Sequence, residues 1–180
     1  MPEDWLFREG RRAAAAEHLY DAAAELIARD GGDALSVDKL AAETHCSRAT
    51  VYRYVGGTQQ IREAVLVRSA TRIVDNVRHA VRGMSGDRRV IMAIEVAVAQ
   101  IRDDPAGRLF LESAQQSSTW ITESAAVTAF ATELAGVASD DKQCARWIAR
   151  VVLSLLFWPD PDSEHTLLAR FVAPAFAVSE

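Results

Sequence analysis

The stretch that decides the fold of this chain is residues 47–57, SRATVYRYVGG. Its β-branched and aromatic residues would suit a strand. It nevertheless opens on Ser47, a residue type that commonly caps helices, and it closes on a pair of glycines, which commonly end them. Two arginines and two tyrosines lie between these ends. We therefore predict a short helix whose polar side chains can contact another molecule.

A second short helix is predicted just before this one. Ser36 is placed to cap it, and the helix ends near Glu43. Three residues, 44–46, then form a tight turn in which His45 tolerates a positive φ. Two short helices joined by three residues form a helix-turn-helix unit. The inward residues of the first of these helices are Val37, Leu40 and Ala41.

An alanine-rich helix precedes the helix-turn-helix and ends at Gly31, which suits a left-handed cap. Its inward face consists of Leu19, Ala23, Leu26 and Ile27. For the helix-turn-helix itself we expect a small inner core of Ala42, Val51 and Val55. The side chains left to project from the second helix are then Arg48, Ala49, Thr50, Tyr52 and Arg53.

The rest of the chain also shows helical periodicity. One long helix is predicted from Thr58, as its cap, to about residue 82, a length of roughly 37 Å that can join a small N-terminal unit to a separate body. Further helices are predicted around residues 90–101, 106–116, 120–135, 140–157 and 161–177. No convincing strand is found, so the predicted class is all-α, with domains at residues 1–57 and 58–180.

Composition narrows the function. The chain has 180 residues, 49% of them hydrophobic, without a run of 18 apolar residues or a basic leader, so we expect a soluble cytoplasmic protein. Cys46 and Cys144 cannot form a disulfide framework, and neither these cysteines nor the histidines have the spacing of a metal site. No phosphate-binding loop or hydrolase motif is found, so neither an enzyme nor a cofactor is expected.

Charge is unevenly distributed. The formal net charge is −5, and residues 1–43 hold five Lys or Arg and ten Asp or Glu. Residues 44–62, in contrast, hold three arginines and no acidic residue. A local positive face of this kind can bind phosphate even on an acidic protein, although a solvated basic face is the alternative.

Three segments together resemble the DNA-binding domain of the tetracycline-repressor (TetR) family: LYDAA at residues 19–23, SVDKLA at 36–41 and SRATVYRYV at 47–55. The resemblance covers roughly residues 12–66, and the remaining two thirds carry no motif. It implies a helical dimer of about nine helices that represses transcription and is released from DNA by a small molecule. The second domain would then bind the ligand and dimerise.

The chain departs from the family pattern at three places. The turn reads Thr-His-Cys at residues 44–46 where the family usually has Ala-Gly-Val. Thr58 stands where the family often has a lysine that contacts phosphate. Asp38 adds a negative charge near the expected DNA face. Cys46 invites the idea of a redox switch there, although its position is normally apolar and a packed thiol is the alternative.

In a helix-turn-helix, the N-terminal part of the second helix enters the major groove. Arg48 can then bond both O6 and N7 of a guanine, with a phosphate contact as the alternative. Tyr52 and Tyr54 suit contacts to the DNA backbone through their hydroxyls, with simple packing as the alternative. Ala49 is small enough for close approach, and Thr50 offers a hydroxyl and a methyl. The predicted DNA contacts are Ser36, Lys39, Ser47, Arg48, Ala49, Thr50, Tyr52, Arg53, Tyr54 and Thr58.

The second domain offers a ligand site and a dimer face. Ligand pockets are mostly apolar with a few polar groups, which favours a small apolar or amphipathic ligand, although such aromatics can simply form core. The candidate ligand contacts are Arg102, Phe110, Gln115, Trp120, Phe130 and Trp147. The helix at 140–157 carries two adjoining apolar stripes and so needs two partners, its own core and a second copy. The predicted interface is Trp147, Val151, Leu155, Leu168, Phe171 and Val172.

The sequence leaves the type of regulation open. A ligand that prefers one tilt of the long helix at 58–82 would change the separation of the two recognition helices in a dimer. A constitutive DNA binder without ligand response and a helical dimeric interaction scaffold are the alternatives. The operator, the ligand and the regulated genes cannot be derived from the sequence.

Overall fold

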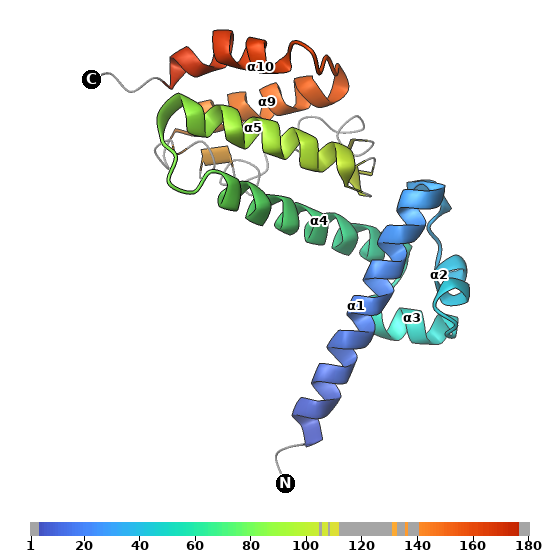
Figure 1. The fold of residues 1–180 in the computed structure, drawn as a ribbon. Helices are drawn as coiled ribbons and strands as arrows, with labels where there is room; N and C mark the ends of the chain where they lie inside the picture. The colour runs from blue at the N-terminus through green and yellow to red at the C-terminus, as the bar shows by residue number, and fades with distance from the viewer. Residues whose placement is uncertain are drawn as a thin grey trace. The chain divides into compact units, whose positions relative to one another are not determined.

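A computed structural model of the chain describes residues 4–104, 106–107, 109–111, 131–132, 136 and 141–176, with the backbone alone for residues 4–9. Within these ranges all regular secondary structure is helical, which confirms the predicted all-α class (Figure 1). The chain forms two compact units, Met1–Ser69 and Ala70–Glu180, here called unit 1 and unit 2. The division falls inside the long helix α4 (Thr58–Ala80), and the predicted boundary at 57/58 lies at the start of that helix.

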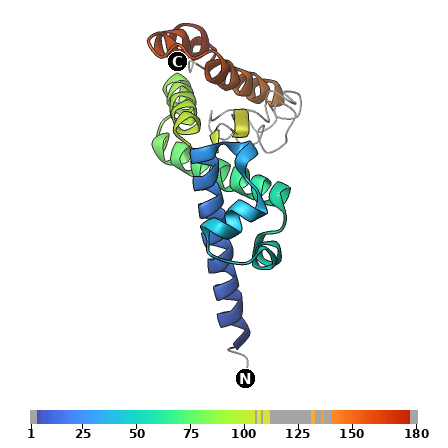
Figure 2. The same cartoon turned by 90° about the vertical axis from the view of Figure 1, so that its right-hand side faces the viewer.

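Unit 1 is built around α1 (Asp4–Asp30), which is followed by a 3₁₀ turn, η1 (Gly32–Ala34). Gly31 ends α1 with a φ of 86°, as predicted, and its N–H donates to the Ile27 carbonyl at 2.9 Å. Figures 1 and 2 both show α2 and α3 against one part of α1, while the N-terminal part of α1 extends past them. The predicted inward residues of α1 are all buried: Leu19, Ala23, Leu26 and Ile27.

The helix-turn-helix consists of α2 (Val37–Glu43) and α3 (Arg48–Val55). Val51 and Val55 are buried as expected, but Ala42 is exposed and the prediction for it is wrong. The inward face of α2 is set by residues three and four apart, which are Val37, Leu40 and Ala41. Ala42 lies one residue, about 100° of rotation, beyond that face.

The start of α4 also differs from the prediction. Thr58 is the first helical residue and not the cap. The N–H of Gly57 instead donates to Oε1 of Gln60 at 2.6 Å, so a side chain from the first turn reaches back to the preceding backbone. Gly56 has a φ of 81°, and a Cβ there would collide with the same Gln60 side chain, so this turn requires glycine. The predicted inward residues from this helix are all buried: Ile61, Val65, Ile73, Val77 and Val81.

Unit 2 contains the second part of α4, α5 (Gly86–Asp103) and α9 (Lys142–Phe157). One core cluster, which includes Ile73, Val77 and Ala93, joins α4 to α5. A larger one, the unit 2 core, joins α5 to α9 and the C-terminal segment. Its buried members are Val90, Ile94, Val98, Ala131, Ala145, Ile148, Leu156, Leu168 and Val172.

The C-terminal segment was predicted as one helix over residues 161–177 but changes its winding along its length. It begins as α10 (Glu164–Leu167), continues as a π-helical turn, η2 (Leu168–Val172), and ends as a 3₁₀ turn, η3 (Ala173–Ala175). Pro174 lies in η3, where it has no N–H for an α-helical bond and its ring crowds the carbonyl four residues earlier. Regular α-helical bonding therefore cannot pass this point.

Candidate nucleic-acid interface

Both helices of the helix-turn-helix begin at a serine cap, as the sequence predicts. Oγ of Ser36 accepts the Lys39 N–H at 3.2 Å, and Oγ of Ser47 accepts the Thr50 N–H at 3.1 Å. The hydroxyls of Ser47 and Thr50 also lie 2.9 Å apart. Each cap satisfies a backbone N–H that would otherwise lack a partner and fixes where its helix starts.

The turn between the two helices is held by local hydrogen bonds. His45 has a φ of 51°, the conformation that the sequence analysis expected of it. The Cys46 N–H donates to the Ala41 carbonyl at 2.9 Å, and the Thr44 hydroxyl donates to the Leu40 carbonyl at 2.8 Å. The Cys46 thiol is half-buried and lies 3.2 Å from the Thr44 hydroxyl. The polar turn Thr-His-Cys thus closes on its own hydrogen bonds.

The outward face of α3 carries most of the predicted DNA contacts. Arg48 is 69% exposed in its side chain and Tyr52 is 59% exposed. Ala49 and Arg53 are also exposed, and the Arg53 guanidinium lies 5.0 Å from the centre of the Tyr54 ring. Thr50, Tyr54 and Thr58 are half-buried. Because Val51 and Val55 are fixed in the core, this polar face cannot rotate inward.

Of the three arginines of residues 44–62, Arg62 is only partly exposed and already has partners within the protein. Nη2 of Arg62 donates to the Gly32 carbonyl at 2.6 Å and lies 3.6 Å from a carboxylate oxygen of Asp33. Its Nε is buried and has no hydrogen-bond partner. Arg62 therefore ties α4 to the η1 turn, and the surface charge of this window is smaller than its composition predicts.

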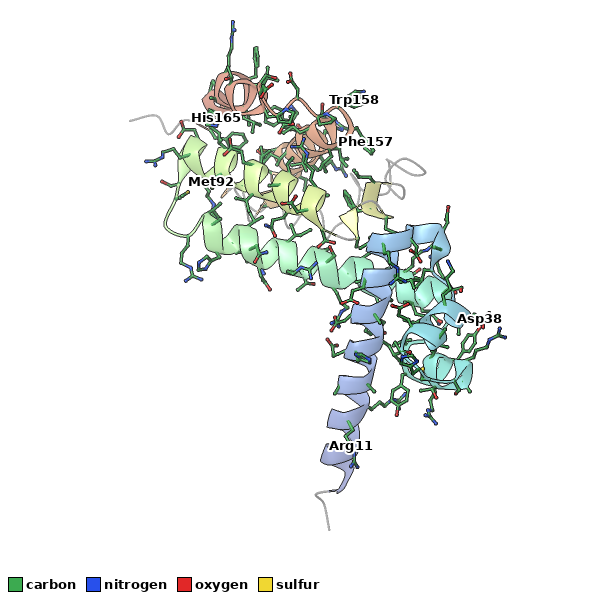
Figure 3. All side chains as sticks on the ribbon, turned by 45° about the vertical axis from the view of Figure 1, so that its right-hand side comes forward. Arg11, Asp38, Met92, Phe157, Trp158 and His165 are labelled. Atoms are coloured by element: carbon green, nitrogen blue, oxygen red, sulfur yellow. The ribbon has the colours of Figure 1, made fainter. Side chains whose placement is uncertain are left out.

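Two cations of α2 and α3, Lys39 and Arg48, lie beside acidic groups. Asp38, at the start of α2, forms an ion pair with Nε of Arg48, at the start of α3. Nζ of Lys39 lies 4.0 Å from a carboxylate oxygen of Asp30. Figure 3 shows Asp38 on the side of α2 that faces away from α1. The acidic residue that departs from the family pattern thus lies next to the predicted base-reading arginine.

Two exposed arginines of α1 were not singled out from the sequence, and one of them, Arg12, lies near this face. Arg11 and Arg12 are exposed on α1, and Nη2 of Arg12 lies 3.5 Å from the Arg53 carbonyl oxygen at the end of α3. Figure 3 labels Arg11 on the part of α1 that extends past α3. These adjacent arginines could have been noticed in the sequence as a basic site. They were missed because acidic residues outnumber basic ones over residues 1–43.

Ion pairs hold α1 to the helices on either side of it. The Arg29 guanidinium makes two 3.1 Å bonds to the Glu43 carboxylate at the end of α2 and lowers the pKa of that carboxyl. On α4, Arg68 pairs with Glu17 and lowers its pKa in the same way. These pairs are largely exposed, so they fix orientation more than they stabilise.

Among the predicted ligand contacts, Arg102 already has partners within unit 2. Its Nη1 and Nη2 donate to Oε2 and Oε1 of Glu164 at 2.9 and 2.6 Å, and Nη2 also donates to the Leu155 carbonyl at 2.9 Å. This fork joins the ends of α5 and α9 to the start of α10. The pairing raises the pKa of Arg102 and lowers that of Glu164. Arg102 thus has a structural role in unit 2, and its contact with a ligand stays a prediction.

The aromatic ligand contacts are only partly within the described residues. Phe110 is half-buried and packs against the unit 2 core. Trp147 is 38% exposed and stacks on Phe176 with ring centres 6.3 Å apart. Gln115, Trp120 and Phe130 lie outside the described residues. Their roles therefore remain predictions.

The predicted dimer residues fall into two groups. Leu168 and Val172 are 2% and 4% exposed and belong to the unit 2 core, so the prediction that they meet a partner is wrong. Their spacing of four residues puts them on one face, and that face turns inward. Val151 and Leu155 are half-buried at the edge of the core. Phe171 is 63% exposed, and Leu167, which was not predicted, is 42% exposed.

Two searches of the described residues bear on other kinds of site. No helix among them is both long and apolar enough to cross a bilayer. In the same part of the chain, no group of three His, Cys, Asp or Glu side chains is arranged to hold a metal ion. We therefore consider two candidate sites: the exposed face of the helix-turn-helix and the apolar residues of unit 2.

Comparison with known proteins agrees with this geometry. The model of the family "Bacterial regulatory proteins, tetR family" matches residues 19–65, which span the second part of α1 to the start of α4. Two uncharacterized HTH-type transcriptional regulators of Mycobacterium tuberculosis, MT1294 and Rv1255c from two strains, are each 27% identical over 181 residues. The alignment covers 95% of this chain and 89% of theirs.

Two solved structures share the fold. The TetR family repressor AlkX from Dietzia sp. strain DQ12-45-1b, implicated in biodegradation of n-alkanes, aligns with a TM-score of 0.59 at 18% identity, covering 92% of this chain and 99% of that one. A TetR-like transcriptional regulator from Rhodococcus sp. RHA1 aligns with a TM-score of 0.50 at 20% identity, covering 87% and 92%. The family match identifies residues 19–65 as a DNA-binding domain of the tetR family, and together with the capped helix-turn-helix and the similarity to HTH-type transcriptional regulators it supports a TetR family transcriptional regulator.

Proposed function

We propose that the chain is a repressor that binds its operator as a homodimer through α3 and leaves it when a small molecule binds unit 2. The observation that carries the DNA contact is the outward face of α3, where Arg48, Tyr52 and Arg53 are exposed between a serine cap and a glycine pair. Regulators of this kind act on the genome, so we propose a cytoplasmic location.

In this proposal the N-terminal turn of α3 lies in the major groove. Arg48 contacts a guanine, and Ala49 beside it is small enough to let the helix approach the base edges. Tyr52 and Arg53 are exposed further along the same helix and contact the DNA backbone. The half-buried Thr50 and Tyr54 and the capping Ser36 and Ser47 contribute positioning contacts, because capped helix starts also direct free N–H groups toward phosphate.

The homodimer is proposed from the apolar side chains that unit 2 leaves exposed. Trp147 on α9, Leu167 on α10 and Phe171 on η2 are all exposed. Large exposed apolar side chains that gather on neighbouring elements commonly mark a contact surface. A two-fold dimer would present two copies of α3 to half-sites about 34–36 Å apart, or more for a longer operator.

Ligand release is proposed from the continuity of α4. Two residues separate this helix from α3, and it contributes Ile73 and Val77 to a core cluster of unit 2. A small apolar or amphipathic ligand bound near that end could therefore favour one orientation of the helix. Linkage then requires that DNA weakens ligand binding by the same factor, typically 5–150-fold, by which ligand weakens DNA binding.

The experiment that tests this function is selection of DNA fragments from a random pool by the intact protein, followed by affinity measurements at several salt concentrations. We expect an enriched two-fold symmetric sequence whose affinity falls as salt rises. Arg48→Ala should reduce discrimination at one base pair in each half-site. Failure to enrich any sequence would contradict operator binding and favour the interaction scaffold, whereas enrichment without any ligand response would leave a constitutive binder.

A further inference from the structure

The ion pair between Asp38 and Arg48 connects the two helices of the helix-turn-helix at their starts. Asp38 is the second residue of α2 and Arg48 is the first residue of α3. Their side chains are 55% and 69% exposed, so the pair lies on the outer surface of unit 1. Exposed ion pairs contribute little to folding stability. The ion pair itself is therefore a weak stability reason for an acidic residue at this position.

The atoms of this pair determine what Arg48 can still bind. The carboxylate of Asp38 pairs with Nε of Arg48. A guanidinium has five N–H donors in a rigid plane, and the Nε donor is only one of them. With Nε occupied, the edge that carries Nη1 and Nη2 can still bond O6 and N7 of a guanine together. Asp38 thus contacts the guanidinium at Nε, and the Nη1 and Nη2 donors are left for a base.

Fixing the plane of an arginine matters because the free side chain is flexible. A long arginine side chain loses rotamer freedom when it is placed in one geometry, and that loss weakens the contact. A side chain already held in the unbound protein loses less of this freedom on binding. Both helix starts that carry the pair are themselves fixed, by the serine caps at Ser36 and Ser47. The pair is therefore attached to a rigid base.

The same carboxylate has the opposite effect on DNA that lacks the right base. Phosphate contacts are the main sequence-independent source of affinity, and a negative charge at the interface opposes them. Paired with Asp38, Arg48 also adds no net positive charge to the surface. The pair should thus weaken binding to DNA in general and retain the bonds that depend on a guanine, which is a route to specificity.

We propose that Asp38 is a specificity-determining residue that positions Arg48 for a guanine and lowers the affinity for DNA without that guanine. This inference rests on the proposed function, since it requires Arg48 to read a base. It adds to that function a second residue, on the other helix, which does not itself contact the base. The DNA that it would favour is double-stranded and has a guanine at the position that faces the first turn of α3.

The test is a double-mutant cycle in the intact protein: wild type, Asp38→Asn, Arg48→Ala and the double variant. Each binds the sequence selected by the wild type, its single-base-pair variants and random DNA, at two salt concentrations. Asp21→Asn, on α1, is the matched control because it removes the same charge from an exposed side chain that lies 3.6 Å from Arg68. Circular dichroism checks that every variant is folded.

The expected results separate the inference from the proposed function. Arg48→Ala should lose discrimination at one base pair by about 5–150-fold. Asp38→Asn should reduce discrimination at that same base pair at least threefold. It should also bind random DNA several-fold more tightly. Added to Arg48→Ala, it should change discrimination no further. Asp21→Asn should leave discrimination as in the wild type.

Two outcomes would overturn the inference in different ways. If Arg48→Ala loses discrimination and Asp38→Asn keeps it in full, Arg48 reads the base without help and the role of Asp38 is refuted, while operator binding stands. If Arg48→Ala itself leaves discrimination intact, the proposed base contact fails and the inference fails with it.

Discussion

Replacing Glu164 by glutamine should destabilise unit 2, because Glu164 is the acceptor of the fork that holds α5, α9 and α10 together. The wild-type carboxylate accepts two bonds from Arg102 at 2.9 and 2.6 Å and a third from the Asp160 N–H at 3.2 Å. Its side chain is 14% exposed and that of Arg102 is 30% exposed. The pair is therefore intermediate between a surface ion pair and a buried one.

This intermediate burial sets the size of the effect. Exposed ion pairs contribute about 0–1 kcal/mol to folding stability, whereas removing one partner of a buried pair costs about 3–5 kcal/mol. Glutamine keeps one acceptor oxygen but turns its NH₂ group toward the guanidinium, so we expect a loss of about 1–3 kcal/mol. At this chain length each kcal/mol lowers Tm by about 2–4 °C. Thermal unfolding followed by circular dichroism is the assay.

The effect should depend on pH with a definite sign. Arg102 lowers the pKa of Glu164 in the folded protein, so the stabilisation is fully present above the unfolded pKa of about 4.3. It is lost as pH falls through the lower folded pKa. The Tm difference between wild type and Glu164→Gln should therefore be full at pH 7 and shrink below about pH 4. A difference that is absent at pH 7, or that grows as pH falls, would refute this reasoning.

Glu95→Gln is the control for this measurement. Glu95 on α5 also bonds across to the C-terminal segment, to Nδ1 of His165 at 2.6 Å, but its partner is 75% exposed. We expect a loss below about 1 kcal/mol, because water replaces an exposed contact of this kind. Equal losses in both variants would show that burial does not control the strength of these cross-links.

Three further predictions concern unit 1 and the exposed face of unit 2. Ser47→Ala should cost about 1 kcal/mol and lower operator affinity, because Oγ of Ser47 caps α3 by accepting the Thr50 N–H; denaturant unfolding measures the loss. Arg12→Ala, near the Arg53 carbonyl, should weaken binding to all DNA sequences alike and reduce the salt slope by about 1, measured by fluorescence anisotropy. Phe171→Glu should shift the dimer toward monomer in sedimentation at micromolar concentration, because it puts a charge on an exposed apolar face.

Each of these variants has a matched control elsewhere in the chain. Ser85→Ala removes a serine that precedes α5 without a side-chain cap bond, so it should cost little. Arg146→Ala removes an exposed arginine of α9, and Thr166→Glu adds a charge at an exposed polar position of α10. If a control behaves like its partner variant, the corresponding local explanation is wrong.

The helix-turn-helix could be predicted closely because its signals are local. Ser36 and Ser47 cap helices through bonds to residues three positions away, and Gly31 and His45 adopt positive φ where the chain turns. Such features depend on a few neighbouring residues, which a sequence displays directly. The inward face of the long helix could also be predicted from its apolar spacing, since every predicted inward residue from Ile61 to Val81 is buried.

The wrong predictions concern positions where a neighbouring residue was equally suited to the same role. Ala42 could have faced inward by composition, but the larger Leu40 and Val37 set the face of α2. Thr58 had the chemistry of a cap, yet the helix already includes Thr58, and the N–H of Gly57 before it donates to Gln60. Periodicity also could not tell which stripe of the C-terminal segment meets the core, and Leu168 turned inward while Phe171 turned outward.

Contacts between residues far apart in the chain could not be predicted from the sequence. Arg62 counted as surface charge, but it contacts Gly32, thirty positions earlier. Arg102 suited a ligand contact by its chemistry, and only the packing of α10 shows that Glu164 already accepts its bonds. The ion pair of Asp38 with Arg48 likewise depends on the angle between two helices. Charges find partners through tertiary structure, which a local pattern does not contain.

Sequence-specific binding of DNA by α3 is the central claim, and competition between the selected operator and random duplex of equal length tests it most directly. The intact protein is titrated onto labelled operator at several salt concentrations while either unlabelled duplex competes. We expect the operator to compete at least about 10³-fold more effectively than random duplex, with both affinities falling as salt rises. Equal competition by the two duplexes at every salt concentration would contradict the claim.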